Sequence, residues 1–462
     1  MTTAPMQLLK RRLLSGGAWA FGGKILIALV GLVSSALLAR LLSPQELGVY
    51  FLAYSIVSLG TTLGALGLTQ TVVRLVAEDM GLNLFGRVRR VIGVVLGFGT
   101  LGALGVGFAY LLFGDNLAEG VFESPALAAV GGLVAGWIMV GTLQGIFGEI
   151  FRGFHDIRLA TILGGQTTGT ASGGATMALL AASLFLLWLV ESQATLATVI
   201  LLAACSGAAA TLVAGWLLRR KVAGLPPRSP DESKKMDSRE VLGQVLSVSW
   251  PLLVTGVVMF ARTNVDVWVL GAFRPPGDVA LYGAANRLVS MVTMPLIMVN
   301  AVVPPLVAEM YAQGRREQLE RILRGVATLG GIPAALASMA CIFLAGPILG
   351  LVFGDYFREG AIALALLSIG PLAGVCVGSC GVVLTYSGHQ KTMMVIALTT
   401  GTATFAGMLA AVGPYGIVGV ATVRMVGQVL QNGLMLVMAR RRTGMWTHMG
   451  FKGLPGLLRV MR

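Results

Sequence analysis

The chain has 462 residues, of which 56% are hydrophobic and only 12% are charged, so it is too apolar for a soluble globular protein. Its formal net charge of +14 would suit a nucleic-acid-binding protein only if the basic residues gathered on one folded surface. Instead they lie between apolar runs of about 20 residues, each long enough to cross a bilayer. Nucleic acid is therefore not an expected partner, and membrane lipids are.

The apolar runs predict an all-α integral membrane protein with about twelve transmembrane helices. Several runs exceed a minimal crossing, so these helices are expected to tilt or to extend beyond the bilayer. In chain order, the predicted spans lie near residues 13–39, 47–76, 90–114, 126–149, 159–190, 195–218, 242–273, 279–308, 324–353, 360–386, 392–412 and 416–439.

The basic residues alternate from one loop to the next, which predicts the orientation of the chain. One set of loops carries most of the 34 Lys and Arg residues, whereas the opposite loops hold only Arg40, Arg274 and Arg358. By the positive-inside rule, the basic loops and both termini are expected in the cytoplasm of a bacterium, with the protein in its inner membrane. The basic groups are Lys10–Arg12, Arg87–Arg90, Arg152 with Arg158, Arg219–Arg239, Arg315–Arg324, Lys391 and Arg440–Arg462.

A polar segment divides the chain into two halves. Residues 219–240 contain Pro226, Pro227 and Pro230 among mixed charges, which is typical of a linker. The expected organisation is an N-terminal six-helix lobe (1–218), this cytoplasmic linker, a C-terminal six-helix lobe (241–440) and a basic cytoplasmic tail (441–462). Because each half has an even number of spans, both enter the membrane in the same direction, and a pseudo-twofold axis is expected along the membrane normal.

An internal repeat supports the division into halves. The stretch 39–54, ARLLSPQELGVYFLAY, returns at 271–286 as GAFRPPGDVALYGAAN, shifted by 232 residues. Pro44 then corresponds to Pro276, and Tyr50 to Tyr282. In each copy, Pro and an acidic residue mark a turn between two apolar segments. A duplicated membrane unit with alternating access between its two halves is typical of transporters.

Residues suited to enzyme or cofactor chemistry are sparse. The four cysteines lie within predicted spans without metal-ligand spacing, and the glycines around Lys24 lack the spacing of a phosphate-binding loop. We therefore expect no catalytic residue, no metal and no cofactor, and the chain is not expected to be an enzyme. Gly93 and Gly97 are four residues apart in one span, a spacing that favours close packing of helices.

Four basic residues lie inside predicted spans and form the candidate substrate site. They are Lys24, Arg262, Arg287 and Arg424. Such residues are costly in hydrocarbon and usually face a helix-bundle interior or a wet cavity. Arg262 has Asp266 one turn later, which predicts an ion pair, whereas Arg287 and Arg424 lie nearer the outer end and could instead reach the lipid headgroups. A cavity with several cations and one paired acid suits an anionic substrate, such as a diphosphate.

The motifs ARLLSPQELGVY and GLTQTVVRLVAE resemble the N-terminal region of bacterial polysaccharide and oligosaccharide flippases, members of the multidrug/oligosaccharidyl-lipid/polysaccharide (MOP) exporter superfamily. DVWVLG, LYGAANRLV and GPYGIVGVA in the second half agree. The resemblance implies a flippase that moves an undecaprenyl-diphosphate-linked oligosaccharide to the periplasmic leaflet for exopolysaccharide, capsule or O-antigen synthesis. It also implies possible partners among other polysaccharide-assembly proteins.

Two other functions remain open. A multidrug or organic-cation extruder of the same superfamily would share the architecture, but the first six spans contain no Asp or Glu away from their ends to bind a cation. A membrane polymerase or ligase of the same glycan pathway is less favoured. It would be expected to carry a large outer loop with reactive groups, and the longest outer loop here, 114–125, is short and acidic.

Overall fold

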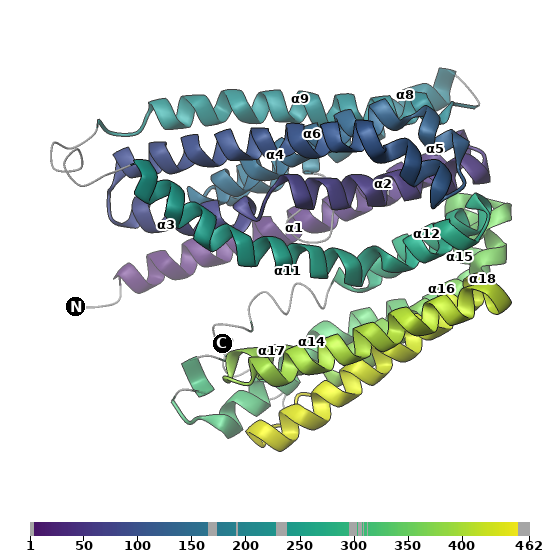
Figure 1. Ribbon diagram of the computed structural model, residues 1–462. Helices are drawn as coiled ribbons and strands as arrows, with labels where there is room; N and C mark the ends of the chain where they lie inside the picture. The colour runs from purple at the N-terminus through teal and green to yellow at the C-terminus, as the bar shows by residue number, and fades with distance from the viewer. Residues whose placement is uncertain are drawn as a thin grey trace. The chain divides into compact units, whose positions relative to one another are not determined.

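The computed structural model consists of helices and their connections throughout the part of the chain that it describes (Figure 1), namely residues 4–164, 173–190, 193–227, 238–294, 303, 307, 309–311 and 313–450. Eight of the described helices are long and apolar enough to cross a membrane, and shorter apolar helices cover Ile25–Leu41 and Gly174–Val190. The prediction of an all-α, multi-pass membrane protein is confirmed.

The first six predicted spans correspond to nine helices. The second, fourth and fifth of these spans each contain two described helices, and residues 165–172 within the fifth span lie outside the described residues. The helices are α1 (Ala4–Leu41), α2 (Pro44–Gly64), α3 (Leu68–Gly81), α4 (Phe85–Gly120), α5 (Pro125–Ala129), α6 (Gly131–Gly153), α7 (Ile157–Leu163), α8 (Gly174–Val190) and α9 (Leu196–Ala223).

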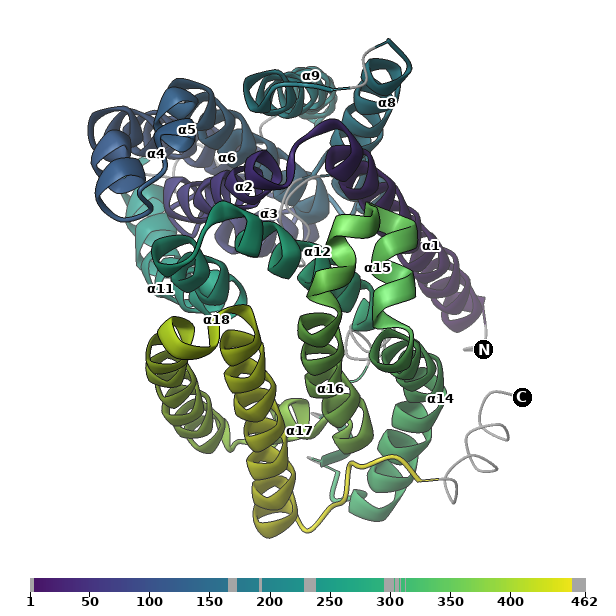
Figure 2. The ribbon, with the colours of Figure 1, turned by 90° about the vertical axis from the view of Figure 1, so that its right-hand side faces the viewer.

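The second half follows the same course. The described elements are α11 (Ser238–Phe273), α12 (Pro276–Val292), α14 (Arg316–Phe343), α15 (Ala345–Phe353), the 3₁₀ helix η1 (Asp355–Gly360), α16 (Ala361–Val377), α17 (Cys380–Tyr386) and α18 (Gln390–Thr443). The last of these, α18, contains both the eleventh and the twelfth predicted spans. The two spans are separated by a sharp kink at Gly416, whose backbone angles are non-helical (φ 54°, ψ −136°). Figure 2 shows α18 turning back on itself there.

Contacts between residues divide the chain into two units, Met1–Val265 and Asp266–Arg462, with the boundary inside α11. In the first unit α6 is central, since it packs against α2, α3, α4 and α9 (Figure 1). In the second unit α16 is central and packs against α12, α14 and α18. These two helices belong to the fourth and tenth predicted spans, so the central helix is the fourth of its half both times, as the internal repeat requires.

The repeated turn has the predicted structure in both copies. Ser43 caps α2 and accepts a hydrogen bond from the Glu46 backbone N–H, while the Glu46 side chain accepts one from the Ser43 N–H. This reciprocal arrangement is a capping box, which satisfies N–H groups at a helix start. In the second copy Pro276 begins α12, and the Asp278 carboxylate accepts a hydrogen bond from Arg274 at 2.8 Å.

The second predicted span is broken between α2 and α3 at Gly67, where φ is +74°. A Cβ atom at this position would lie 2.1 Å from the Ser249 carbonyl oxygen of α11 and 2.7 Å from the Leu253 nitrogen. Beside this contact, the Thr71 and Ser249 hydroxyls form a hydrogen bond of 2.9 Å. Only glycine allows this close approach of the α11 backbone to the break between α2 and α3.

A second break separates α16 from α17 at Gly378 and leaves two backbone carbonyls without helical partners. The chain following α18 supplies the donors: Thr447 Oγ1 donates to Val377 O at 2.9 Å, and Met449 N donates to Cys376 O at 3.0 Å. Gly450 N donates to Thr328 Oγ1 on α14 at 3.0 Å. We refer to residues 443–450 as the C-terminal clasp, because they connect the end of α18 to the end of α16 and to α14.

Candidate functional site

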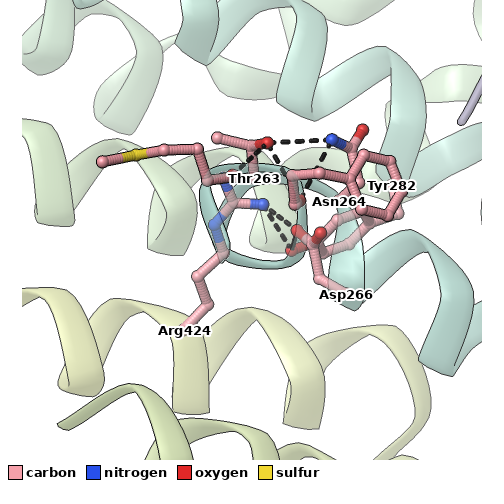
Figure 3. Close-up of polar contacts among 7 residues, drawn as sticks. Thr263, Asn264, Asp266, Tyr282 and Arg424 are labelled. Atoms are coloured by element: carbon pink, nitrogen blue, oxygen red, sulfur yellow. Dashed lines mark hydrogen bonds and ion pairs between the residues drawn. The ribbon is translucent and has the colours of Figure 1, made fainter. Parts of the chain in front are cut away.

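A buried carboxylate in the second unit forms the centre of the candidate site. Asp266 lies near the C-terminal end of α11 and is only 2% exposed. Tyr282 of α12, which is fully buried, donates its hydroxyl hydrogen to Asp266 Oδ2 at 2.5 Å. Arg424 of α18 forms an ion pair with the same oxygen. Three helices thus meet at one carboxylate (Figure 3).

The Arg424 side chain connects this cluster to its surroundings. Its Nη1 atom contacts Asp266 and also donates to Tyr282 Oη at 3.2 Å. The Arg424 side chain keeps 24% of its surface exposed, whereas the Asp266 side chain keeps 3%. A ligand that approached the cluster would therefore meet the Arg424 side chain before the carboxylate.

The second carboxylate oxygen of Asp266 is differently placed. Oδ1 is buried and has no hydrogen-bond partner among the described residues. Thr263 and Asn264, one turn earlier on α11, do not supply one, since their contacts are local: Thr263 Oγ1 donates to Met259 O at 3.0 Å, and Asn264 Nδ2 donates to Thr263 Oγ1 at 2.8 Å (Figure 3). Burying a carboxylate oxygen without a hydrogen bond costs free energy. The contacts of Tyr282 and Arg424 with Oδ2 must therefore stabilise the buried Asp266 carboxylate.

The two repeats differ at this position. With the shift of 232 residues, Asp266 corresponds to Ser34, a buried serine of α1 whose hydroxyl donates to the Val30 carbonyl at 2.9 Å. Tyr282 corresponds to Tyr50, which lies against Trp137 with ring centroids 6.0 Å apart. The first copy therefore lacks the carboxylate at this position, and the ionic cluster belongs to the second half of the chain.

The predicted ion pair between Arg262 and Asp266 is wrong. Asp266 is paired with Arg424, and Arg262 is exposed on α11. The sequence spacing places both residues on neighbouring turns of one helix, but the buried carboxylate is reached by side chains from α12 and α18. The partner was therefore chosen by packing between helices rather than by proximity along the chain.

The remaining predicted cations occupy different environments. Lys24 lies in α1, but its side chain is outside the described residues. Arg287 lies in α12 and is half-buried. Of the four predicted binding residues, Arg424 contacts the intramembrane acid Asp266. Whether Lys24, Arg262 and Arg287 share a site with it stays a prediction.

A polar row that was not predicted from the sequence continues from Arg424 along α18. Gln428 lies against Gly370 of α16, where an added Cβ would come within 2.4 Å of its Oε1 atom. Asn432 lies one turn further on, against Gly374, with its Nδ2 atom 3.1 Å from such a Cβ. The signal was present in the sequence, since Arg424, Gln428 and Asn432 are spaced by four residues and share one helix face.

The other buried acids lie near helix ends in the first unit. Glu149 of α6 is 3.1 Å from Arg152, and Asp79 of α3 is 3.4 Å from Arg87. Within the described ranges, His, Cys, Asp and Glu residues form no group of three that could hold a metal ion. These pairs join neighbouring turns and loops, so we assign them a structural role.

Comparison with known families identifies two matching models. A model described as "Polysaccharide biosynthesis protein" matches residues 13–311, and the MatE model matches residues 251–401. No individual curated protein matches the sequence.

Solved structures with a similar fold include three transporters. An inward-facing multidrug resistance transporter of the MATE family and MOP superfamily aligns with a TM-score of 0.64 and 16% identity, covering 90% of this chain and 94% of that one. The lipid II flippase MurJ in an inward closed conformation aligns with a TM-score of 0.62 and 13% identity, covering 94% of this chain and 89% of that one. The Vibrio cholerae MATE transporter VcmN in its bent form aligns with a TM-score of 0.57 and 16% identity, covering 95% of this chain and 98% of that one. The chain therefore has the fold of these transporters.

Proposed function

The chain belongs to the polysaccharide biosynthesis protein family of MOP-superfamily transporters, and from this premise we propose that it flips a lipid-linked oligosaccharide across the membrane. The substrate would be an undecaprenyl-diphosphate-linked oligosaccharide for exopolysaccharide, capsule or O-antigen synthesis. It would move from the cytoplasmic to the periplasmic leaflet by alternating access of two lobes. MurJ, which shares the fold, is itself a lipid II flippase.

The observation that carries the proposal is the excess of basic over acidic residues inside the spans. Lys24, Arg262, Arg287 and Arg424 lie in α1, α11, α12 and α18, and Asp266 offsets one of these charges. A diphosphate must leave the headgroup region to cross the bilayer. Cations in a wet cavity of low dielectric constant can replace part of its hydration while the polyprenyl tail stays in lipid.

The proposed orientation follows from the distribution of basic loops. With both termini in the cytoplasm of a bacterial inner membrane, transport towards the periplasm delivers glycan to the side where extracellular polymers are assembled. The lobes of this proposal are residues 1–218 and 241–440, with 219–240 as a cytoplasmic linker and 441–462 as a cytoplasmic tail.

Extrusion of organic cations is the second candidate, because the MatE model matches residues 251–401. An organic cation would require an accessible carboxylate. Asp266 is the intramembrane acid of the second unit, but it is 2% exposed and already paired with Arg424. We therefore favour the anionic, lipid-linked substrate.

A deletion strain separates the two functions. Loss of a glycan flippase should leave the lipid-linked intermediate on the inner leaflet and reduce surface glycan, and the plasmid-borne wild-type gene should restore export. Loss of an extruder should instead sensitise the cells to organic cations such as ethidium while surface glycan stays normal. Normal glycan together with raised ethidium sensitivity would reject the proposed function in favour of the second one.

A further inference from the structure

The cluster at Asp266 has two oxyanion-binding groups, Tyr282 and Arg424, which both contact one carboxylate oxygen. A guanidinium group binds carboxylates and phosphates with the same planar set of N–H donors. The Asp266 carboxylate therefore has the chemistry of the phosphate that Arg424 would meet in a lipid diphosphate. One cation thus has two possible anionic partners.

We propose that Asp266 is an internal competitor of the substrate diphosphate for Arg424, and that Tyr282 retains the carboxylate when Arg424 moves to the substrate. This inference rests on the proposed function, since it takes a diphosphate as the second partner of Arg424. Asp266 and Tyr282 are then positioning residues, which set how tightly the anion is held. Arg424 is the residue that contacts it.

The exposure of the two side chains supports this exchange. The Arg424 side chain is 24% exposed, so an anion can reach part of it, whereas the Asp266 side chain is only 3% exposed. The described contacts of Arg424 with Asp266 and Tyr282 both use Nη1. Because a guanidinium carries five N–H donors, an arriving phosphate can engage it before the contact with Asp266 is lost.

Tyr282 lowers the free-energy cost of moving Arg424 from Asp266 to the substrate. A buried carboxylate that lost its only partner would be strongly destabilised. Here the Tyr282 hydroxyl lies 2.5 Å from the same oxygen and is fixed by a fully buried ring, so it remains as a donor when Arg424 leaves. The cluster therefore has two stable arrangements, with Arg424 on the carboxylate or on the substrate.

Competition between Asp266 and the diphosphate for Arg424 would help the substrate to be released. A transported ligand must be bound strongly enough to enter and weakly enough to leave. An arginine without a neighbouring acid could bind a diphosphate too tightly for release. With Asp266 beside it, Arg424 can form its ion pair again when the substrate leaves. Ser34 occupies the equivalent position in the first half of the chain, so only one of the two repeats carries this competitor.

The test measures binding of inorganic pyrophosphate to the purified full-length protein by calorimetry. Asp266→Asn removes the competing charge, so we expect about tenfold tighter binding together with slower glycan export. Tyr282→Phe removes the donor that stabilises the abandoned carboxylate, so we expect about tenfold weaker binding. About a tenfold change in affinity is the smallest effect expected from the loss of one hydrogen bond to a charged group. The opposite signs distinguish competition from a structural role, which would weaken binding in both variants.

Asp278→Asn is the matched control, because it removes a carboxylate from another ion pair of the same unit, Arg274–Asp278 at 2.8 Å. It should leave pyrophosphate affinity unchanged. If Asp266→Asn does not fold, Tyr282→Phe decides: unchanged or tighter binding overturns the inference.

The failures of the inference and of the proposed function are separable. If the wild-type protein binds pyrophosphate and both variants shift the affinity in the same direction, or not at all, Asp266 is no competitor and the flippase proposal stands. If the wild-type protein binds no pyrophosphate, the inference is wrong. Normal glycan export in the deletion strain would in addition reject the flippase proposal.

Discussion

Arg262 and Arg424 show how strongly the role of a charged residue depends on its surroundings. Both lie inside predicted spans, but only Arg424 is directed at the buried carboxylate of Asp266. This changes how the Arg262 variants should be interpreted. Arg262→Ala does not deprive Asp266 of its ion-pair partner, so a loss of transport in this variant reports on the arginine itself.

At the residue scale, Lys24→Ala should abolish glycan export while the protein is still inserted at normal levels. The reason is that a cation inside α1 is expected to face a wet cavity and bind the diphosphate. Complementation of the deletion strain is the measurement. Arg74→Ala is the control, since Arg74 is exposed on α3 and is expected to contact headgroups, and it should restore export. Full export by Lys24→Ala at normal expression would contradict the proposed cation site.

At the scale of elements, glycines matter where helices break rather than where they repeat every four residues. Among the described residues, an added Cβ at Gly93 or Gly97 would meet nothing within 4 Å, so the predicted close packing at this motif is wrong. The close approach in α4 occurs instead at Gly102, where a Cβ would lie 2.2 Å from the Gly64 carbonyl oxygen of α2. The two motif glycines lie on another face of α4, away from its neighbours.

Gly67→Ala should destabilise the protein strongly, whereas Gly97→Ala should be neutral or slightly stabilising. A positive φ alone costs a non-glycine residue about 1–2 kcal/mol, and the new Cβ would also overlap the α11 backbone. At Gly97 the same change adds helix propensity without a contact. Thermal unfolding of the purified variants is the measurement. Equal melting temperatures would contradict the close approach of the α11 backbone to Gly67.

The C-terminal clasp should control access to Cys380, a cysteine that is 2% exposed beside the break between α16 and α17. Thr447→Val removes the hydrogen bond to Val377 O and leaves that carbonyl unpaired, at a cost of about 1–3 kcal/mol. We expect faster labelling of Cys380 by a maleimide in a variant without the other cysteines. Thr422→Val removes a hydroxyl whose hydrogen bond to Val418 O lies within α18, so it should leave the labelling rate unchanged.

The clasp should also weaken in acid because of His448. Burial, followed by the charge of Arg324, lowers the pKa of His448 below its ordinary value of 6.5, while Glu320 opposes the shift. The neutral form is thus favoured in the docked clasp. Its stabilisation is complete above pH 6.5 and is lost as the pH falls through that value towards the lowered pKa. Cys380 labelling of the wild type relative to His448→Gln should rise from pH 7.5 to pH 5.5, and a constant ratio would contradict this.

At the scale of the whole molecule, the alternation of basic loops makes a prediction about sidedness. Cysteines introduced at Glu119 and Asp355 should react with a membrane-impermeant reagent added to the periplasmic side, and one at Gln318 should not. All three positions are exposed, so differences in labelling report on the side of the membrane rather than on burial. Periplasmic labelling at Gln318 would reverse the proposed orientation and the direction of transport.

The sequence by itself determined the membrane class, the number of spans and the duplicated turns. These features are encoded locally, since hydropathy over about 20 residues decides which segments can enter a bilayer, and Pro with an acidic residue ends one helix and begins the next. The capping box at Ser43 and the helix start at Pro276 occur where the repeat placed them. The lateral position of each helix is not encoded in this local way.

Only the tertiary structure decided the contacts between helices. Tyr282 and Arg424 are 142 residues apart in sequence, and no local pattern indicates that they share Asp266. The same holds for Gly67 against Ser249, and for the clasp that closes the end of α16. The physical reason is that a bilayer specifies which segments are buried in it, but not which faces meet. The faces are selected by close packing and by the need to pair each buried polar group.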